Sequence, residues 1–70
     1  MIQKGIYEHY KGHKYQVLDV AVYEPTMEPV VIYEALYNNE VSKLWVRPEE
    51  EFSGMVNIDG ELIPRFKKVD

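Results

Sequence analysis

Residues 30–37 read VVIYEALY, and this stretch decides the fold class. Apolar side chains occupy both sets of alternating positions, with Glu34 as the exception. A strand in the middle of a sheet, covered on both faces, has this pattern. A helix over residues 35–45 is the competing interpretation, but Asn38 and Asn39 favour a turn there. We therefore predict a central strand over residues 30–37.

The residues before this strand predict two further strands. One is Ile6 to Tyr10, followed by a tight turn at Lys11-Gly12. The other is residues 15–23, YQVLDVAVY, which carries apolar side chains at both odd-numbered and even-numbered positions. A bulge near Leu18 would turn both sets inward. The stretch EPTMEP at 24–29 holds two prolines and predicts a loop.

Residues 43–52, KLWVRPEEEF, predict a short strand over Lys43 to Arg47 that is stopped by Pro48. Three glutamates follow the proline. In a helix that starts there they would lie in the first turn, where the helix dipole favours acidic side chains. We predict a short 3-10 turn over residues 48–52, with Phe52 as a core anchor. In the strand, Leu44 and Val46 form the expected core pair.

Trp45 and Arg47 then share the opposite face of that strand. The guanidinium of Arg47 could stack on the indole there. It could equally bridge a carboxylate such as Glu28 or Glu34. A structural role and a binding role for the Trp45–Arg47 pair both remain open at this point.

The segment VNIDGELI, residues 56–63, predicts a hairpin, because Asp-Gly is a preferred two-residue turn between strands. Pro64 limits further pairing, so the closing strand is expected at a sheet edge. An exposed edge of this kind could support a homodimer.

Five to six short antiparallel strands with one helical turn predict an all-β fold: a single SH3-like β-barrel domain over residues 1–70. An OB-fold barrel is the nearest alternative, but it usually needs a longer chain and a helix between strands. The chain has no cysteine, which excludes disulfides and cysteine-based zinc sites. Its two histidines are too few for a metal site by themselves. We expect no metal and no cofactor.

The net charge of -4 disfavours binding to a phosphate backbone. The acidic residues concentrate in the middle of the chain, and both ends are mildly basic. No apolar run has the length of a signal peptide or of a transmembrane helix. We therefore expect a cytoplasmic protein with no membrane partner.

Several short motifs occur together: HYKG at 9–12, YQVL at 15–18, VVIYEALY at 30–37, LWVRP at 44–48 and PRF at 64–66. In this combination the chain resembles a family of short bacterial proteins known as domain of unknown function 1653. The resemblance runs from Tyr7 to Phe66 and implies a compact SH3-like β fold. It implies no activity. The family often has a His and a Ser in the loop where this chain has Tyr23 and Glu24.

No catalytic residues are predicted. Nucleophilic catalysis needs a nucleophile, a base and an orienting group. The two serines lie in turn contexts, and His9 and His13 flank a turn. No glycine-rich phosphate loop is present. An enzyme acting on a small molecule is therefore the third hypothesis.

The first hypothesis is a non-catalytic interaction module that binds a protein or peptide through an aromatic-lined barrel face. An acidic rim around the aromatic residues would favour basic partners. The second hypothesis is a nucleic-acid or ribonucleoprotein accessory that uses the basic ends, including Lys11, Lys14, Arg65, Lys67 and Lys68. The predicted partner-contact residues are Tyr10, Glu28, Tyr33, Tyr37, Trp45, Arg47 and Arg65.

Overall fold

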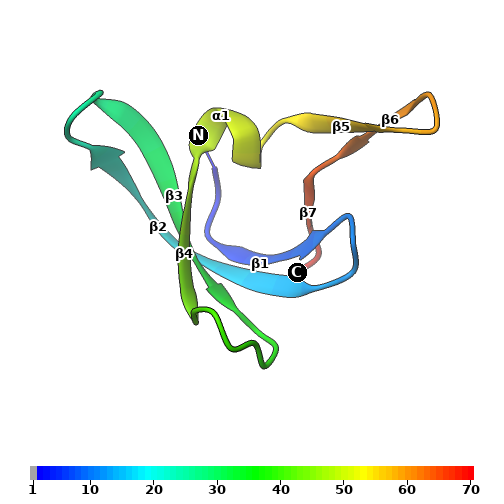
Figure 1. Ribbon diagram of the computed structural model, residues 1–70, viewed down its shortest axis with the longest axis horizontal. Helices are drawn as coiled ribbons and strands as arrows, with labels where there is room; N and C mark the ends of the chain where they lie inside the picture. Colours follow the sequence, from blue (N-terminus) through cyan, green and yellow to red (C-terminus); the bar gives the residue numbers. More distant parts are fainter. Residues whose placement is uncertain (1) are drawn as a thin grey trace.

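A computed structural model describes residues 2–70 and shows an all-β fold with one turn of helix (Figure 1). The elements follow one another as β1 (Gly5–His9), β2 (Lys14–Tyr23), β3 (Glu28–Ala35), β4 (Leu44–Pro48), α1 (Glu49–Phe52), β5 (Met55–Ile58), β6 (Glu61–Pro64) and β7 (Phe66–Lys68). The all-β prediction is confirmed. In the described part of the chain there are seven strands rather than five or six.

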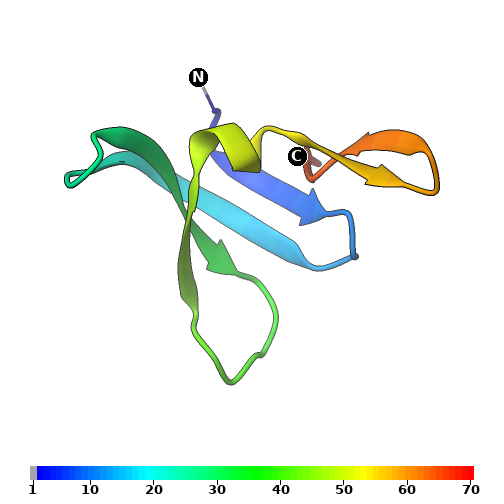
Figure 2. The ribbon, with the colours of Figure 1, turned by 45° about the horizontal axis from the view of Figure 1, so that its top comes forward.

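The strands form two antiparallel sheets that do not close into a barrel. The larger sheet has the order β4-β3-β2-β1-β7, and β5 and β6 pair only with each other. Figure 2 shows the β5–β6 hairpin projecting away from the curved main sheet. The prediction of a closed barrel therefore needs correction. β5 and β6 pair with each other, and neither pairs with β4 or β7. These two strands therefore remain the edges of the main sheet.

A bulge bends β2, as the sequence predicts. The pairing of β2 with β3 shifts between Val17 and Asp19, which leaves Leu18 as the extra residue. The loop after β2 is shorter than predicted. Residues 24–27 form the turn, and Pro29 already lies in β3 opposite Val22.

The predicted helical turn is present but is α rather than 3-10. The backbone N–H of Ser53 donates to the carbonyl of Glu49 over 3.0 Å, which is the four-residue spacing of an α-helix. Pro48 precedes the turn in an extended conformation. The glutamates of α1 lie in its first turn, where the helix dipole favours them.

The Asp59-Gly60 hairpin is confirmed. The φ angles are 53° at Asp59 and 84° at Gly60, as a two-residue turn with two left-handed positions requires. After this hairpin the chain continues past Arg65 into β7, a strand the sequence interpretation missed. β7 pairs with β1 at the edge of the main sheet. The predicted edge strand, residues 61–63, lies in β6, which pairs only with β5 and therefore keeps a free edge, as predicted.

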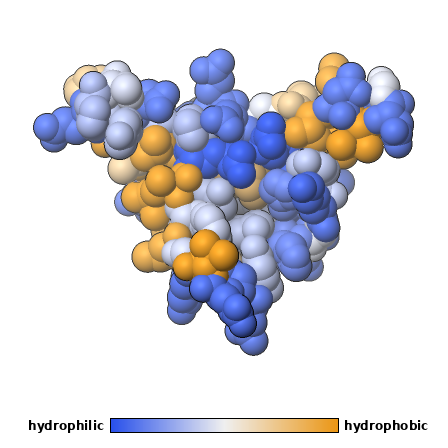
Figure 3. Space-filling view, viewed as in Figure 1, coloured by the Kyte–Doolittle hydropathy of each residue, from blue (hydrophilic) through white to orange (hydrophobic). Residues whose placement is uncertain are grey.

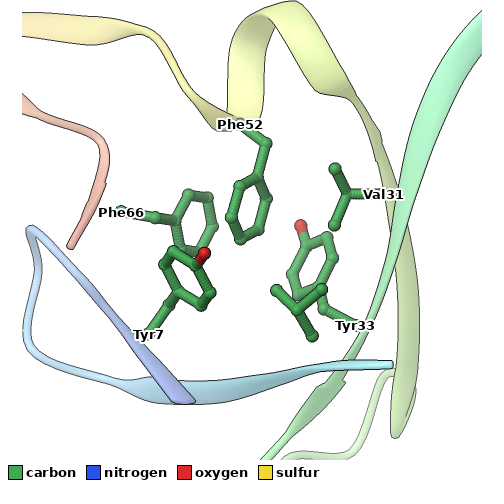
Figure 4. Close-up of a cluster of buried hydrophobic side chains, with 6 residues drawn as sticks. Tyr7, Val31, Tyr33, Phe52 and Phe66 are labelled. Carbon is green, nitrogen blue, oxygen red and sulfur yellow. The ribbon is translucent and has the colours of Figure 1, made fainter. Parts of the chain in front are cut away.

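Aromatic rings form most of the core (Figure 4). The buried cluster consists of Tyr7, Val17, Val31, Tyr33, Phe52 and Phe66. Phe52 is fully buried, as expected, and its ring stacks on Phe66 with 4.0 Å between centroids and 5° between planes. α1 and the start of β7 thus supply the two rings that cover the concave face of the sheet.

The faces of β4 are the reverse of the prediction. Leu44 and Val46, the expected core pair, are 55% and 65% exposed. Trp45 lies opposite Tyr33 and Arg47 lies opposite Val31 in the β3–β4 register. Residues directly opposite on paired strands share a face, so Trp45 and Arg47 lie on the core side.

Candidate binding surface

A continuous series of ring and cation contacts surrounds Phe66 at the margin of the core. We call it the cationic aromatic cluster, and the residues in contact are His9, Tyr10, Lys11, His13, Tyr15, Tyr37, Arg47 and Phe66. Arg65 is counted with them because it precedes Phe66 in the chain and its charge acts on His9. Its members come from the β1–β2 hairpin, the end of β3, β4 and the start of β7. The fold therefore brings together side chains from four separate parts of the sequence.

Arg47 links the cluster to the core. Its Nε donates to the Tyr33 hydroxyl over 3.3 Å, and its guanidinium carbon lies 5.7 Å from the centre of the Phe66 ring. A terminal nitrogen pairs with Glu51 at 3.4 Å. The expected stacking partner was Trp45, and the expected carboxylates were Glu28 or Glu34. Because Arg47 lies on the core side, its guanidinium packs on Phe66 rather than on Trp45. It pairs with Glu51 rather than with Glu28 or Glu34.

Tyr37 lies just beyond β3 and gives the cluster its outer ring. Its hydroxyl shares a 2.7 Å hydrogen bond with that of Tyr15. The His13 ring stacks on Tyr37 with 4.0 Å between centroids and 19° between planes. Burial, together with the hydrogen bond shared with Tyr37, raises the pKa of Tyr15, so this phenol stays protonated. The hydroxyls of the two tyrosines therefore form a hydrogen-bonded pair beside the cations.

His9 lies among positive charges. Partial burial lowers its pKa below the ordinary value of 6.5, and the charges of Arg47 and Arg65 lower it further. Its Nδ1 accepts a hydrogen bond from the backbone N–H of Lys11 over 3.1 Å, which requires an unprotonated nitrogen. The His9 ring also contacts Tyr10 and the edge of Phe66. His9 is therefore a neutral, structural member of the cluster.

Arg65 joins β6 to β7 and holds two other segments in place. Its backbone N–H donates to Gly54 and its carbonyl accepts from Tyr10, both over 3.0 Å. In the described part of the chain, the buried side-chain nitrogens without a hydrogen-bond partner are Arg65 Nε and Trp45 Nε1. Both belong to predicted partner-contact residues. Both nitrogens are buried, so neither is open to an acceptor from outside the protein.

The structure groups the predicted residues as follows. Tyr10, Tyr37, Arg47 and Arg65 lie in the cluster. Tyr33 is a buried core residue that supports Arg47 through its hydroxyl. Trp45 packs on the core opposite Tyr33. Glu28 does not belong to the group, because it lies exposed at the start of β3, opposite Tyr23.

The sequence interpretation did not assign His9, His13, Tyr15 or Phe66 to the site. A signal for the histidines was present in the Lys11-Gly12 turn. The backbone N–H of His9 donates to the carbonyl of His13 over 2.8 Å, so the turn places both rings at one end of the hairpin. No local pattern marks Phe66, because the rings it joins are distant in sequence.

The described part of the surface includes the following two hollows. One of about 320 Å³ adjoins the cluster and is lined by residues 35–39 and Lys43. Another of about 480 Å³ is lined by Ile2, Lys4, Val17, Asp19, Val20, Pro29 and Glu49. Tyr37 forms part of the first hollow, so a ligand there would touch the cluster.

Metal and membrane features can be described for residues 2–70. Within this range no three or more His, Cys, Asp or Glu side chains are grouped as a metal ion would require. None of the helical structure in the same range has the length and apolar character to cross a membrane.

Comparison with known proteins places these features in a family. Residues 5–68 match the model of a protein family of unknown function, DUF1653. The chain is also similar to a DUF1653 protein from Bordetella bronchiseptica of known crystal structure. The identity is 32%, the TM-score is 0.90, and the match covers 97% of this chain and 87% of the other. No curated protein matches the chain. The chain therefore belongs to the DUF1653 family.

Proposed function

We propose that this chain is a small, non-catalytic interaction module that binds an acidic segment of a protein partner across the cationic aromatic cluster. The observation that carries the proposal is the gathering of positive side chains around His9 in a protein whose net charge is -4. Arg47, Arg65 and Lys11 reach this point from separate segments. Arginine beside aromatic rings recognises carboxylates well.

The chemistry of the partner differs from the first expectation. An acidic rim was expected to favour basic partners. Glu28 lies elsewhere, however, and Glu34 pairs with Lys43 at 3.2 Å. The rings that come together are accompanied by cations, which supports an acidic partner. Tyr37 and His13 would contact apolar or aromatic side chains between its carboxylates.

A second candidate is a nucleic-acid accessory. The stacked rings of His13 and Tyr37, with cations nearby, have the components of a base-stacking platform. The negative net charge opposes this candidate. We assign no catalytic step to His9, because the charges that lower its pKa are cationic, and no carboxylate contributes. We place the module in the bacterial cytoplasm, where a chain without cysteine fits the reducing conditions.

The test is an NMR titration of the labelled protein with three probes of equal length. These are a peptide of alternating Glu and Tyr, a peptide of alternating Lys and Tyr, and a single-stranded oligonucleotide. We expect the acidic peptide to shift the amide signals of His13, Tyr37 and Arg65. The same shifts with the oligonucleotide alone would favour the second candidate, and their absence with every probe would overturn the proposal.

Matched variants localise the binding. Arg65→Gln and Tyr37→Ala should each weaken binding of the acidic peptide at least about tenfold, which corresponds to about 1.4 kcal/mol. Glu28→Gln is the control, since Glu28 lies away from the cluster. Circular dichroism of each variant checks that the fold is retained.

A further inference from the structure

The outer edge of β4 is unpaired within residues 2–70, since β4 is the last strand of the main sheet and bonds only to β3. Sheet edges of this kind present backbone donors and acceptors to any strand that can reach them. Natural proteins usually protect them with charges or bulges. On β4 the exposed side chains are instead Leu44 and Val46.

The hydrogen-bond pattern identifies which backbone groups face outward. The N–H of Ala35 donates to the carbonyl of Lys43 over 2.8 Å, so this pair is bonded across β3 and β4. Bonded and non-bonded pairs alternate along antiparallel strands. Trp45 and Arg47 are therefore bonded to β3, and the N–H and C=O groups of Leu44 and Val46 point away from the sheet.

The outer face beside this edge is apolar. Leu44 and Val46 are 55% and 65% exposed, and Val46 lies opposite Ile32 of β3. Figure 3 shows apolar side chains over the region where β3 and β4 run in Figure 1. An added strand would thus gain apolar contacts as well as backbone hydrogen bonds.

The charges at the two ends of β4 are opposite. Lys43 precedes the strand with a side chain that is 76% exposed, and the acidic turn Glu49–Glu51 follows it. Antiparallel pairing of two identical strands brings the start of one to the end of the other. Antiparallel pairing with a second copy of β4 therefore places opposite charges next to each other at both ends of the strand.

We propose that this chain forms a homodimer in which β4 pairs with β4 of a second copy, antiparallel about a twofold axis at Val46. Val46 exchanges both of its outward backbone hydrogen bonds with Val46 of the second copy. The N–H of Leu44 donates to the carbonyl of Pro48 of the second copy. Proline has no N–H to return to the Leu44 carbonyl, but that carbonyl already accepts a hydrogen bond from the Ser42 hydroxyl of its own chain over 2.7 Å. Lys43 faces Glu49 of the second copy.

This register also suits the side chains. Val46 meets Val46, and Leu44 meets Pro48, on the outer face. Trp45 lies beside Arg47 of the second copy on the inner face, which places a cation next to an indole. A register shifted by two residues would instead place Lys43 beside Arg47, two positive charges. The charges therefore select the register centred on Val46.

The dimer is expected to be weak and dependent on concentration, because one strand pair buries less than the ~1,200 Å² typical of stable complexes. It does not depend on the proposed function, since Leu44 and Val46 lie outside the cationic aromatic cluster.

The test is sedimentation equilibrium over a range of protein concentrations. Val46→Lys should raise the dissociation constant of the dimer at least about tenfold, by opposing two charges at the twofold axis. Val41→Lys is the matched control, because Val41 is 80% exposed and precedes β4. A wild-type protein that remains monomeric at its highest soluble concentration would overturn the proposal, as would equal dissociation constants for wild type and Val46→Lys.

Hydrogen exchange tests the register in the unmodified protein. The amides of Leu44 and Val46 point to solvent in the single chain and should become protected as the protein concentration rises. Protection of Trp45 and Arg47, already bonded to β3, should not change. A dimer that leaves the exchange of Leu44 and Val46 unaltered would use another surface, and the proposal would be wrong.

Discussion

The Nε of Arg47 donates a 3.3 Å hydrogen bond to the hydroxyl of Tyr33, a core residue fourteen positions earlier in the chain. The bond fixes a cation at the boundary between the aromatic core and the proposed binding surface. Tyr33 is only 4% exposed, so its hydroxyl depends on a protein partner for hydrogen bonding.

Replacing Tyr33 by Phe keeps the ring in the core and removes this acceptor. We expect the free energy of unfolding to fall by about 1 kcal/mol, the usual value of one hydrogen bond to protein stability. Urea denaturation measures the change. Tyr23→Phe is a control, because Tyr23 is 52% exposed at the end of β2. Equal losses in the two variants would contradict a role for the Arg47–Tyr33 bond.

Phe52 should be the most sensitive core position in α1. Phe52→Ala removes a fully buried ring that stacks on Phe66, and the expected cost is about 3–5 kcal/mol. A small domain has only about 5–15 kcal/mol of stability in total, so this variant is at the limit of folding. Phe52→Leu retains part of the volume and should remain folded at a smaller cost. Met27→Ala, at a position 71% exposed, should change little in the same urea titration.

The turn between β5 and β6 depends on the backbone conformation of Gly60. Its φ angle is 84°, and a Cβ added there would meet no atom within 4 Å. The cost of Gly60→Ala is therefore conformational rather than steric, and we expect about 1–2 kcal/mol. Thermal unfolding checks this against Glu61→Ala, an exposed change in the same hairpin. No difference between the two variants would argue against the positive-φ turn.

His9 should make stability depend on pH. Its pKa in the folded protein lies below the ordinary 6.5, so as pH falls the unfolded chain takes up this proton first. The contribution of His9 to the free energy of unfolding is complete above about pH 6.5. It is lost as the pH falls toward the lowered pKa of His9 in the folded protein. Urea denaturation at a series of pH values measures the loss.

The variant His9→Asn removes the titrating group and offers an oxygen in place of the Nδ1 acceptor. We expect its stability to vary less with pH in this window than that of the wild type. Val41→Asn is the control, since Val41 is 80% exposed and does not titrate. An unchanged pH dependence in His9→Asn would show that His9 is not its source.

The elements with a local signal were predictable from the sequence. The Leu18 bulge was predicted because apolar residues occupy both odd-numbered and even-numbered positions of β2. The Asp59-Gly60 turn was predicted from its residue types. Both depend on interactions between neighbours in the chain or across a single strand pair. The α-helical turn was placed correctly by Pro48 and the acids after it, although its hydrogen-bond spacing was not.

The faces of β4 could not be predicted in the same way. Alternation divides the strand into Leu44 with Val46 and Trp45 with Arg47, but it does not say which pair faces inward. Choosing the aliphatic pair assumed that β4 needs them to fill the core. Phe52 and Phe66 fill that space instead, and pairing with Tyr33 and Val31 turns Trp45 and Arg47 inward. These are long-range contacts without a local pattern.

The proposed binding surface also depends on contacts between residues distant in the chain. Tyr10, Tyr37, Arg47 and Arg65 were selected individually, as aromatic or cationic residues in suitable contexts. Their meeting around Phe66 depends on β7, which the sequence interpretation missed. Glu28 was selected on charge alone, and the register of β2 and β3 places it elsewhere.

The pairing of β7 with β1 has a consequence for how the chain folds during synthesis. Phe66 lies opposite His9, so β7 can complete the edge of the main sheet only after some sixty residues that follow β1 have been translated. Until residues 66–68 have emerged, β1 lacks a neighbour on its outer side and Phe52 lacks its stacking partner. Contacts between such distant residues also slow folding. The main sheet therefore stays incomplete, and its core unfilled, until translation has passed residue 68.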